Sequence, residues 1–250
     1  MVGIRRTLTF ESSAEITIPS KIGDEDVKAI GGNAFKNNTT ITSVEIPSTV
    51  KTIKYNAFQG CEALKSITVP DSVTAIGEYA FDGCSALKTV VIGSGLKKIG
   101  RLIFQNCISL EKVTLGENVT GINDDSLDAG AFSGCTALSE IVWNDKIETI
   151  GDRAFYGCTA LRSLSIPASV ITIGPSAFSG CTGLNNVNLG INLEKIDANA
   201  FNGCKGIKEI TLPDSLKTLE YNAFKDCTSL RTVDLGNGLS AMENNVFDGC

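Results

Sequence analysis

Phenylalanine recurs in this chain at a nearly fixed interval, and that interval limits the folds that the chain can adopt. Every step of the series is 23 residues, except for 28 residues between Phe104 and Phe132. A cysteine follows three residues after each member, apart from the first, where Asn38 stands, and this column accounts for all nine cysteines. A repeat of about 20 to 50 residues is typical of a stacked array, because no single unit can bury its apolar side alone. The series comprises Phe35, Phe58, Phe81, Phe104, Phe132, Phe155, Phe178, Phe201, Phe224 and Phe247.

One unit, FQGCEALKSITVPDSVTAIGEYA, starts at Phe58 and shows what each repeat predicts locally. Ile67 and Val69 are two residues apart, which is the period of a strand with one buried face. Pro70, or glycine in some other units, then ends the strand and turns the chain. Ile76 and the apolar residues four, five and eight positions after it favour one or two turns of helix. Each unit is therefore expected to be a short strand, a turn and a second short segment that ends in a helical or 3-10 piece.

The string L-x-x-I-x-I-P-x-x-V-x-x-I-G-x-x-A-F-x-G-C resembles the 23-residue leucine-rich repeat of the BspA-like family, found in bacterial surface proteins and some protist proteins. The resemblance covers residues 14–250. It implies an α/β leucine-rich-repeat solenoid, a curved right-handed coil with a parallel sheet on the concave face and short helical or 3-10 segments elsewhere. It also implies binding or adhesion, at a cell surface or after secretion, rather than catalysis. The departures from the pattern are Asn38, Ile103, Trp143 and Val246.

The repeat also predicts the domain organisation. We expect an N-terminal cap and a partial first repeat over residues 1–34, then one quasi-linear domain of tandem repeats over residues 35–250, whose units contact only their neighbours. Five extra residues occur twice, at 23–27 and within 123–130. The chain stops at Cys250 in mid-unit, without the polar cap that a terminal repeat needs. We interpret it as truncated at the C-terminus, and its first residues lack the apolar core of a signal peptide.

Composition excludes several classes of function. The net charge of −6 and the pI of about 4.8 argue against non-specific binding to nucleic acid or to an anionic membrane. There is no apolar run of about 18 residues, so nothing in the sequence predicts membrane insertion. The chain has no histidine, which excludes Ser-His-Asp and Cys-His catalytic devices. Its glycines lie at turns and form no phosphate-binding loop. We therefore expect no enzymatic activity and no cofactor.

The cysteine column predicts buried free thiols. Equivalent residues of neighbouring units lie about 4.8 Å apart with parallel side chains, whereas a disulfide needs converging Cβ atoms about 3.8 Å apart. Free cysteine commonly behaves as a small buried apolar residue. A zinc site has little support, because the sequence contains neither a C-x-x-C pair nor a histidine.

The strand residues that lie between the buried ones are expected to face outward, and they form the candidate binding surface. Two such columns are small, polar and varied, while the buried columns are nearly fixed. Exposed strand positions favour Thr and Ser in any case, so a plain solvated surface is an equal alternative. A third column, mostly basic, would rim a ligand surface or form a solvated edge. The candidate concave face in the central units comprises Lys112, Thr114, Glu140, Val142, Trp143, Ser163 and Ser165.

Trp143 and the insertion at 123–130 each leave alternatives open. Trp143 occupies a core column of smaller Ile, Val and Leu residues, so it is either a core residue or an aromatic displaced to the surface, where it would anchor a partner. The insertion is acidic, and Asp124, Asp125 and Asp128 are conceivable Ca²⁺ ligands, but the EF-hand spacing is absent. A protruding contact loop and a neutral insertion are the other interpretations, since lengthening a surface loop costs under about 1 kcal/mol.

The sequence thus predicts a non-catalytic protein-binding or adhesion module of a cell-surface or secreted protein. Its partner would be a protein, such as a host-matrix or cell-surface protein, bound through the concave sheet face. The adhesive role and the location are implied by the family resemblance and not by residue chemistry. Two alternatives are a structural spacer that displays a neighbouring domain and a glycan-binding repeat domain, which would require exposed aromatic side chains.

Overall fold

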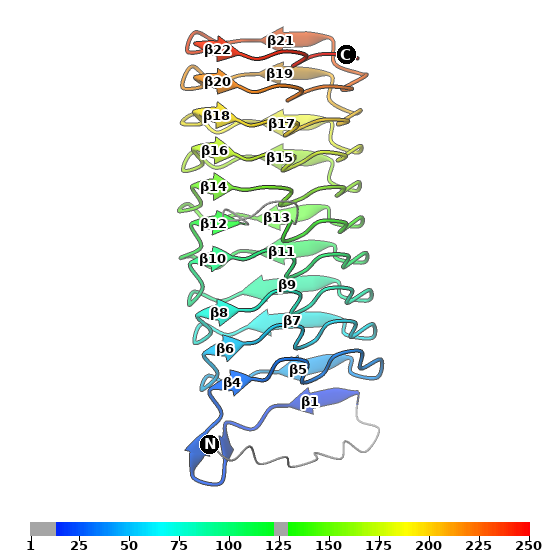
Figure 1. The fold of residues 1–250 in the computed structure, drawn as a ribbon, viewed down its shortest axis with the longest axis vertical. Coiled ribbons are helices and arrows are strands. Elements are labelled where there is room, and N and C mark those ends of the chain that lie inside the picture. The colour runs from blue at the N-terminus through cyan, green and yellow to red at the C-terminus, as the bar shows by residue number, and fades with distance from the viewer. Residues whose placement is uncertain (1–13, 123–129) are drawn as a thin grey trace.

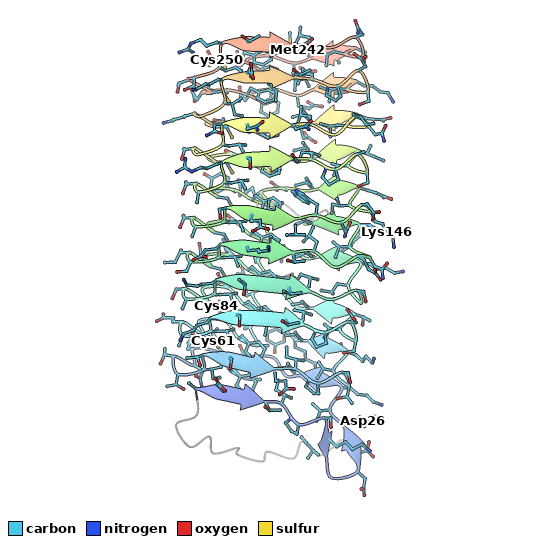
Figure 2. The ribbon with its side chains drawn as sticks, turned by 180° about the vertical axis from the view of Figure 1, so that it is seen from behind. Asp26, Cys61, Cys84, Lys146, Met242 and Cys250 are labelled. Atoms are coloured by element: carbon cyan, nitrogen blue, oxygen red, sulfur yellow. The ribbon has the colours of Figure 1, made fainter. Side chains whose placement is uncertain are left out.

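The computed structural model describes residues 14–122 and 130–250. Its coils are stacked along one long axis, and the described residues run from one end of the stack to the other (Figure 1 and, seen from behind, Figure 2). Each coil has three sides, which are a strand of a first row, a short strand of a second row, and a turn side that contains the repeating phenylalanine. The predicted solenoid is therefore confirmed.

The first strand row begins each repeat and carries the longer strands. Its members are β1 (Glu15–Thr17), β5 (Ser43–Glu45), β7 (Ser66–Val69), β9 (Thr89–Ile92), β11 (Lys112–Thr114), β13 (Glu140–Val142), β15 (Ser163–Ser165), β17 (Asn186–Asn188), β19 (Glu209–Thr211) and β21 (Thr232–Asp234).

The second strand row consists of two-residue strands with one inward apolar residue. Its members are β4 (Ala29–Ile30), β6 (Thr52–Ile53), β8 (Ala75–Ile76), β10 (Lys98–Ile99), β12 (Gly121–Ile122), β14 (Thr149–Ile150), β16 (Thr172–Ile173), β18 (Lys195–Ile196), β20 (Thr218–Leu219) and β22 (Ala241–Met242).

Both rows pair in parallel, and equivalent residues of neighbouring repeats lie opposite each other, as Ile67 and Val90 do. The second row runs unbroken through seven strands from β10 to β22. The first row is continuous from β1 to β13 and then divides, with β15 paired only to β17 and β19 only to β21. The same coils are therefore joined along one side and separated along another.

The extra residues 23–27 form most of a small hairpin at the N-terminal end of the stack. Strand β2 (Lys21–Ile22) pairs with β3 (Glu25–Asp26) in antiparallel fashion, and Gly23 in the connecting turn has a φ of 64°. Figure 1 shows this hairpin projecting beside the first coils. The insertion is accommodated at a corner, as a solenoid allows.

The expected helical or 3-10 segments are wrong, because the described residues contain no helix. Around Phe58 the chain forms consecutive β-turns, with the amides of Ala57, Gln59 and Cys61 donating to carbonyls three residues earlier. The alternate amides, including that of Phe58, donate to carbonyls of the next coil. Asn56 and Gly60 flank the phenylalanine with φ values of 53° and 68°, and left-handed residues so close together interrupt a helix. The α/β assignment is therefore corrected to a parallel β-solenoid, and its curvature and handedness stay predictions.

The repeating phenylalanines form a continuous stack inside the solenoid. Successive rings, such as Phe58 and Phe81, have centroids 5.1 Å apart and planes 3° apart. The spacing follows the separation of about 4.8 Å between paired strands, so the ladder repeats once per coil. The eight rings from Phe58 to Phe224 are fully buried, whereas Phe35 and Phe247 near the two ends are only partly buried.

The cysteine column has a role that the repeat pattern did not reveal. Each thiol donates a hydrogen bond to the phenylalanine carbonyl of the preceding coil, as Cys84 Sγ does to Phe58 O at 3.2 Å. The same carbonyl accepts the amide of Cys61, so both of its lone pairs are used. Burial raises the pKa of the Cys181 thiol to about 12, which keeps it protonated and able to donate. All nine thiols are free and eight are buried, so the prediction fails only at Cys250, which is exposed.

Candidate functional site

The outer face of the first strand row is where the structure displays variable side chains. Strand β7 alternates exposed and buried residues, with Ser66 and Thr68 outward and Ile67 and Val69 inward. This alternation follows from the two-residue period of a strand. Because the strands stack in register, each coil presents two outward side chains beside those of its neighbours.

Four of the predicted binding residues lie together on β11 and β13. Lys112 pairs with Glu140 and Thr114 with Val142 across the two strands, as the register predicted. Lys112 Nζ lies 2.6 Å from Glu140 Oε1, with the side chains 43% and 54% exposed. An ion pair this exposed contributes little to stability, but the two charges compensate each other at the centre of the patch.

The other two strand residues of the predicted patch are not contiguous with these. Ser163 and Ser165 lie on β15, which pairs with β17 and not with β13. The expectation that all six strand residues stack at the normal strand spacing is therefore wrong at this boundary. The inward residue Ile141 on β13 is only partly buried, in contrast to the fully buried Val113 on β11. The interior is less well covered where the row divides.

Trp143 directly follows β13, the strand after which the first row divides. Its indole is partly buried against the core and meets the ring of Phe155 edge-on, with centroids 5.8 Å and planes 75° apart. Phe155 lies on the turn side that follows β13 and β14 in the same coil, so the large indole packs on the phenylalanine stack from a column that smaller residues fill in most other repeats. The core interpretation of Trp143 is the one that this geometry favours, and its role as an anchor stays a prediction.

A second division, between β17 and β19, opens a hollow in the outer face. The hollow has a volume of about 650 Å³ and is lined by residues of β17, β19 and β21. Val187 is partly buried there, and together with Leu189 and Ile210 it lines an apolar region. Asn186 and Asn188 lie on one side and Glu209 and Thr211 on the other. We call this hollow the β17/β19 slot.

The polar side chains of the slot have few partners of their own. Across the described residues, no hydrogen bond or ion pair engages the side chains of Asn186, Asn188 or Glu209. This contrasts with Asn144, whose Nδ2 donates to two backbone carbonyls. These residues belong to the outward columns of the repeat, whereas the binding patch was predicted in the central units. The clustering of asparagines at positions 185, 186 and 188 was the signal that could have directed attention here.

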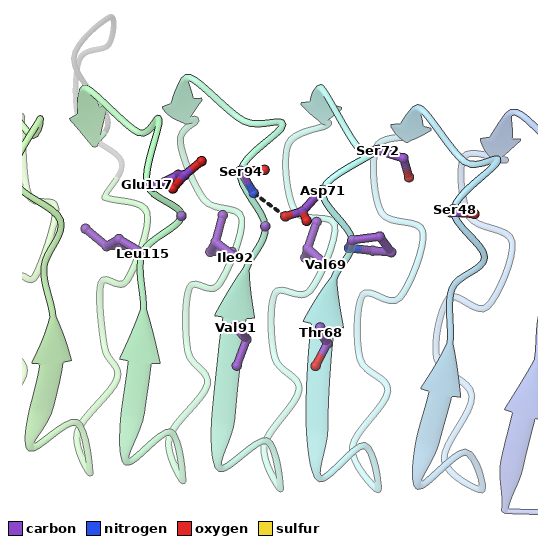
Figure 3. A pocket seen from close by; sticks show the side chains of 13 residues that line it. Ser48, Thr68, Val69, Asp71, Ser72, Val91, Ile92, Ser94, Leu115 and Glu117 are labelled. Atoms are coloured by element: carbon purple, nitrogen blue, oxygen red, sulfur yellow. Dashed lines mark hydrogen bonds between the residues drawn. The ribbon is translucent and has the colours of Figure 1, made fainter.

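A second hollow follows the carboxyl ends of β7, β9 and β11 (Figure 3). Its volume is also about 650 Å³, and Asp71 Oδ1 accepts a hydrogen bond from the Ser94 amide at 2.7 Å. That backbone hydrogen bond holds the pKa of Asp71 below its ordinary value. This hydrogen bond joins two coils and occupies the Asp71 carboxylate. The carboxylate is therefore less available to a ligand than the unpaired polar side chains of the β17/β19 slot.

The remaining sequence expectations concern the basic column, metal ions and membranes. In the basic column, Lys88 Nζ lies 3.2 Å from Glu111 Oε1, and both side chains are well exposed. This arrangement is typical of a solvated edge. Within residues 14–122 and 130–250, no group of three His, Cys, Asp or Glu residues is arranged to hold a metal ion. The acidic residues of the 123–130 insertion lie outside the described residues. Over the described ranges no helix is long and apolar enough to cross a membrane.

Comparison with solved structures places the chain among bacterial leucine-rich-repeat proteins. A leucine-rich repeat protein from Eubacterium ventriosum is 31% identical with a TM-score of 0.61, over 67% of this chain and 43% of its own. The Treponema pallidum leucine-rich repeat protein is 25% identical with a TM-score of 0.54, over 88% of this chain and 79% of its own. A leucine rich cell surface protein from Faecalibacterium prausnitzii is 26% identical with a TM-score of 0.37, over 89% and 87% of the two chains.

The chain therefore spans less than half the length of the Eubacterium ventriosum protein. No curated protein matches it. A family model described as BspA type leucine rich repeat region (6 copies) matches residues 9–129 and 125–250. The period, the phenylalanine and cysteine columns and the parallel stack agree with that match, and the chain belongs to the BspA-type leucine-rich-repeat family.

Proposed function

We propose that this chain is a non-catalytic protein-binding or adhesion module of a cell-surface or secreted protein. The binding surface is the outer face of the first strand row, which the family resemblance expects to be concave. The observation that carries the proposal is the contrast between a fixed interior and a varied outer face on the same strands. Such variation has no role in stacking the coils, whereas it sets which partner the face fits.

The stacked coils favour binding without a large loss of conformational freedom. Most interior side chains of the central coils are fully buried, although Ile141 and Trp143 are only partly buried, and β11 is held in register by β9 and β13. A surface that is already ordered loses little entropy when a partner docks. Lys112, Thr114, Glu140 and Val142 form the contiguous centre of the proposed interface, with Ser163 and Ser165 beyond the division and Trp143 as a candidate anchor.

The partner that this face fits best is another protein, such as a host-matrix or cell-surface protein. The chain carries a net charge of −6, which disfavours nucleic acid. Glycan binding usually relies on exposed aromatic faces, and on the described first-row strands there are none. The absence of histidine and a family that is generally non-catalytic support a binding role over an enzymatic one.

Val142→Glu tests the proposal. It places a charge at the centre of the face, so affinity for a bound partner should fall by about tenfold or more, since a buried unpaired charge at an interface is strongly unfavourable. Surface plasmon resonance against a panel of purified extracellular matrix and cell-surface proteins provides the affinities. Thermal melting of each variant shows whether the fold is retained.

Thr74→Glu is the matched control. Thr74 is exposed beside the second strand row, and its neighbours in the repeat column are Lys51 and Lys97, so the added carboxylate is tolerated. The proposal requires Thr74→Glu to bind as the unmodified chain does. If Val142→Glu binds normally and Thr74→Glu does not, the first-row face is not the interface. If no protein of the panel binds, the spacer interpretation replaces it for these partners.

A further inference from the structure

The β17/β19 slot combines three properties. Its strands are not paired with each other, its base is apolar, and its sides carry polar groups without intramolecular partners. A solenoid gains stability by pairing every strand with its neighbours, so an unpaired boundary at which Val187 is only partly buried suits an external ligand. A ligand role for this slot extends the function proposed above and rests on it.

The charge of the slot is negative. Its two charged lining residues are Glu209 on β19 and Asp234 on β21. Glu209 has no ion-pair or hydrogen-bond partner in the described chain, and Asp234 uses Oδ1 to accept the Gly236 amide at 3.1 Å. Arg231 is nearby in sequence, but its guanidinium donates to the carbonyls of Thr228 and Leu230. The carboxylates are therefore left to face a cationic ligand.

The apolar part of the slot suits the stem of a long basic side chain. Leu189 and Ile210 line the slot but are buried, so its accessible apolar surface comes from Val187, which is partly buried, and from Ile191 at the rim, which is 73% exposed. Arginine and lysine place their methylene groups on apolar surface while the charged end stays hydrated or paired. Asparagine amides both donate and accept hydrogen bonds, so Asn186 and Asn188 are suited to the backbone of an extended peptide.

We propose that the β17/β19 slot binds an extended cationic peptide segment of a partner protein. An arginine or lysine stem lies over Val187 and Ile191, and its cation is held by the carboxylates of Glu209 and Asp234. The asparagine side chains of β17 hold the peptide backbone. Recognition of this kind combines main-chain hydrogen bonds with pockets for alternate side chains.

Two synthetic peptides of equal length provide the probes. One is the fluorescein-labelled heptapeptide Thr-Arg-Thr-Arg-Thr-Arg-Thr, and the other has glutamate in place of arginine. Fluorescence anisotropy measures affinity, and amide chemical shifts map the bound site. The arginine peptide should bind, with shifts centred on Asn186, Asn188 and Glu209, and its affinity should fall as salt rises. The glutamate peptide should not bind there.

The double variant Glu209→Gln/Asp234→Asn removes both charges from exposed positions and should weaken arginine-peptide binding by about three- to tenfold, as expected for two exposed charge pairs. Thr211→Arg places a competing cation in the slot and should weaken binding as well. Glu45→Gln is the matched control, because Glu45 occupies the same strand column as Asp234 but lies on β5, and it should leave binding unchanged.

The proposal is overturned if both peptides bind equally, if the shifts lie away from β17 and β19, or if the double variant keeps full affinity. Maltoheptaose is the third probe. Shifts that it alone produces in the slot would assign the slot to a glycan and overturn the peptide proposal. The wider proposed function is tested separately, because loss of partner binding in Val142→Glu with no effect of Glu209→Gln/Asp234→Asn retains the protein-binding role and rejects only the slot.

Discussion

The second strand row is continuous from β10 to β22, whereas the first row divides twice over the same coils. The difference lies in what each row carries. The second row contributes one inward Ile or Leu in nearly every coil, and Ile150, Ile173 and Ile196 are fully buried. The first row bears the varied outward side chains, and at β13 it also bears Trp143 in a column of smaller residues. From β10 to β22 stacking is maintained by the second row and the turn side, so the first row can open there without breaking the solenoid, whereas between β8 and β10 the second row divides and the first row stays paired.

The largest effect is expected from removing one ring of the phenylalanine stack. Phe155 is fully buried and stacks on Phe132 and Phe178 with centroids 5.3 and 5.4 Å away. Phe155→Ala should lower the free energy of unfolding by about 3–5 kcal/mol, because it leaves a cavity between coils. Ser165→Ala on the outer face should cost under about 0.5 kcal/mol. Denaturant unfolding measures both, and equal losses would contradict the division between a supporting interior and a permissive face.

The cysteine column should give an intermediate effect. Cys204 Sγ donates to Phe178 O at 3.2 Å in a buried setting, so Cys204→Ala removes a hydrogen bond between coils and a buried sulfur. The expected loss is about 1–2 kcal/mol in the free energy of unfolding. Cys250→Ala is the control, since Cys250 is exposed and water can replace its thiol. A larger loss at Cys250 than at Cys204 would show that the thiol ladder does not support the stack.

The smallest effect concerns Asp71 and pH. The Ser94 amide stabilises the carboxylate and lowers the pKa of Asp71 from 3.8, so the carboxylate contributes stability above that pH. This contribution is lost as pH falls through the lowered pKa. The melting temperature of the unmodified chain should exceed that of Asp71→Asn slightly at pH 7, and the difference should vanish in acid. A difference that grows on acidification would contradict the assigned hydrogen bond.

Much of the fold could be predicted because the residues that recur in every repeat are the ones that face the interior. The columns of Phe58, Cys61, Ile67 and Ile76 repeat once per coil, and their spacing predicted the stacked units and inward positions. The turn side was misinterpreted as helical, because apolar spacing alone cannot show where alternate amides bond. The left-handed conformation two residues before the phenylalanine is adopted by asparagine in five repeats, as at Asn56, but also by Tyr79 and Leu102, so residue type marks it only in part.

The candidate site was predicted less well, because the period of the repeat does not show where neighbouring strands stay unpaired. The period predicts the strand register, and this register correctly placed Lys112 beside Glu140. The divisions of the first row depend on how side chains fill the space between particular coils, and a period does not contain that information. Trp143 was a visible irregularity beside the unpaired boundary between β13 and β15, and locating that boundary required the structure. At the boundary between β17 and β19, no residue departs from its column in a way that predicts the opening.

Amide hydrogen exchange across that last boundary tests the central claim most directly. Two hydrogen-bonded amides serve as references. In the second row the Glu220 amide donates to Ile196 O at 3.0 Å, and in the first row the Ile166 amide donates to Asn188 O at 2.8 Å across the paired strands β15 and β17. Leu189 occupies the column of Ile166 but faces the unpaired β19. The account predicts that the Leu189 amide exchanges at least about tenfold faster than those of Ile166 and Glu220, because local opening controls exchange. Equal protection of all three amides would mean that the first row is closed, and would contradict the account.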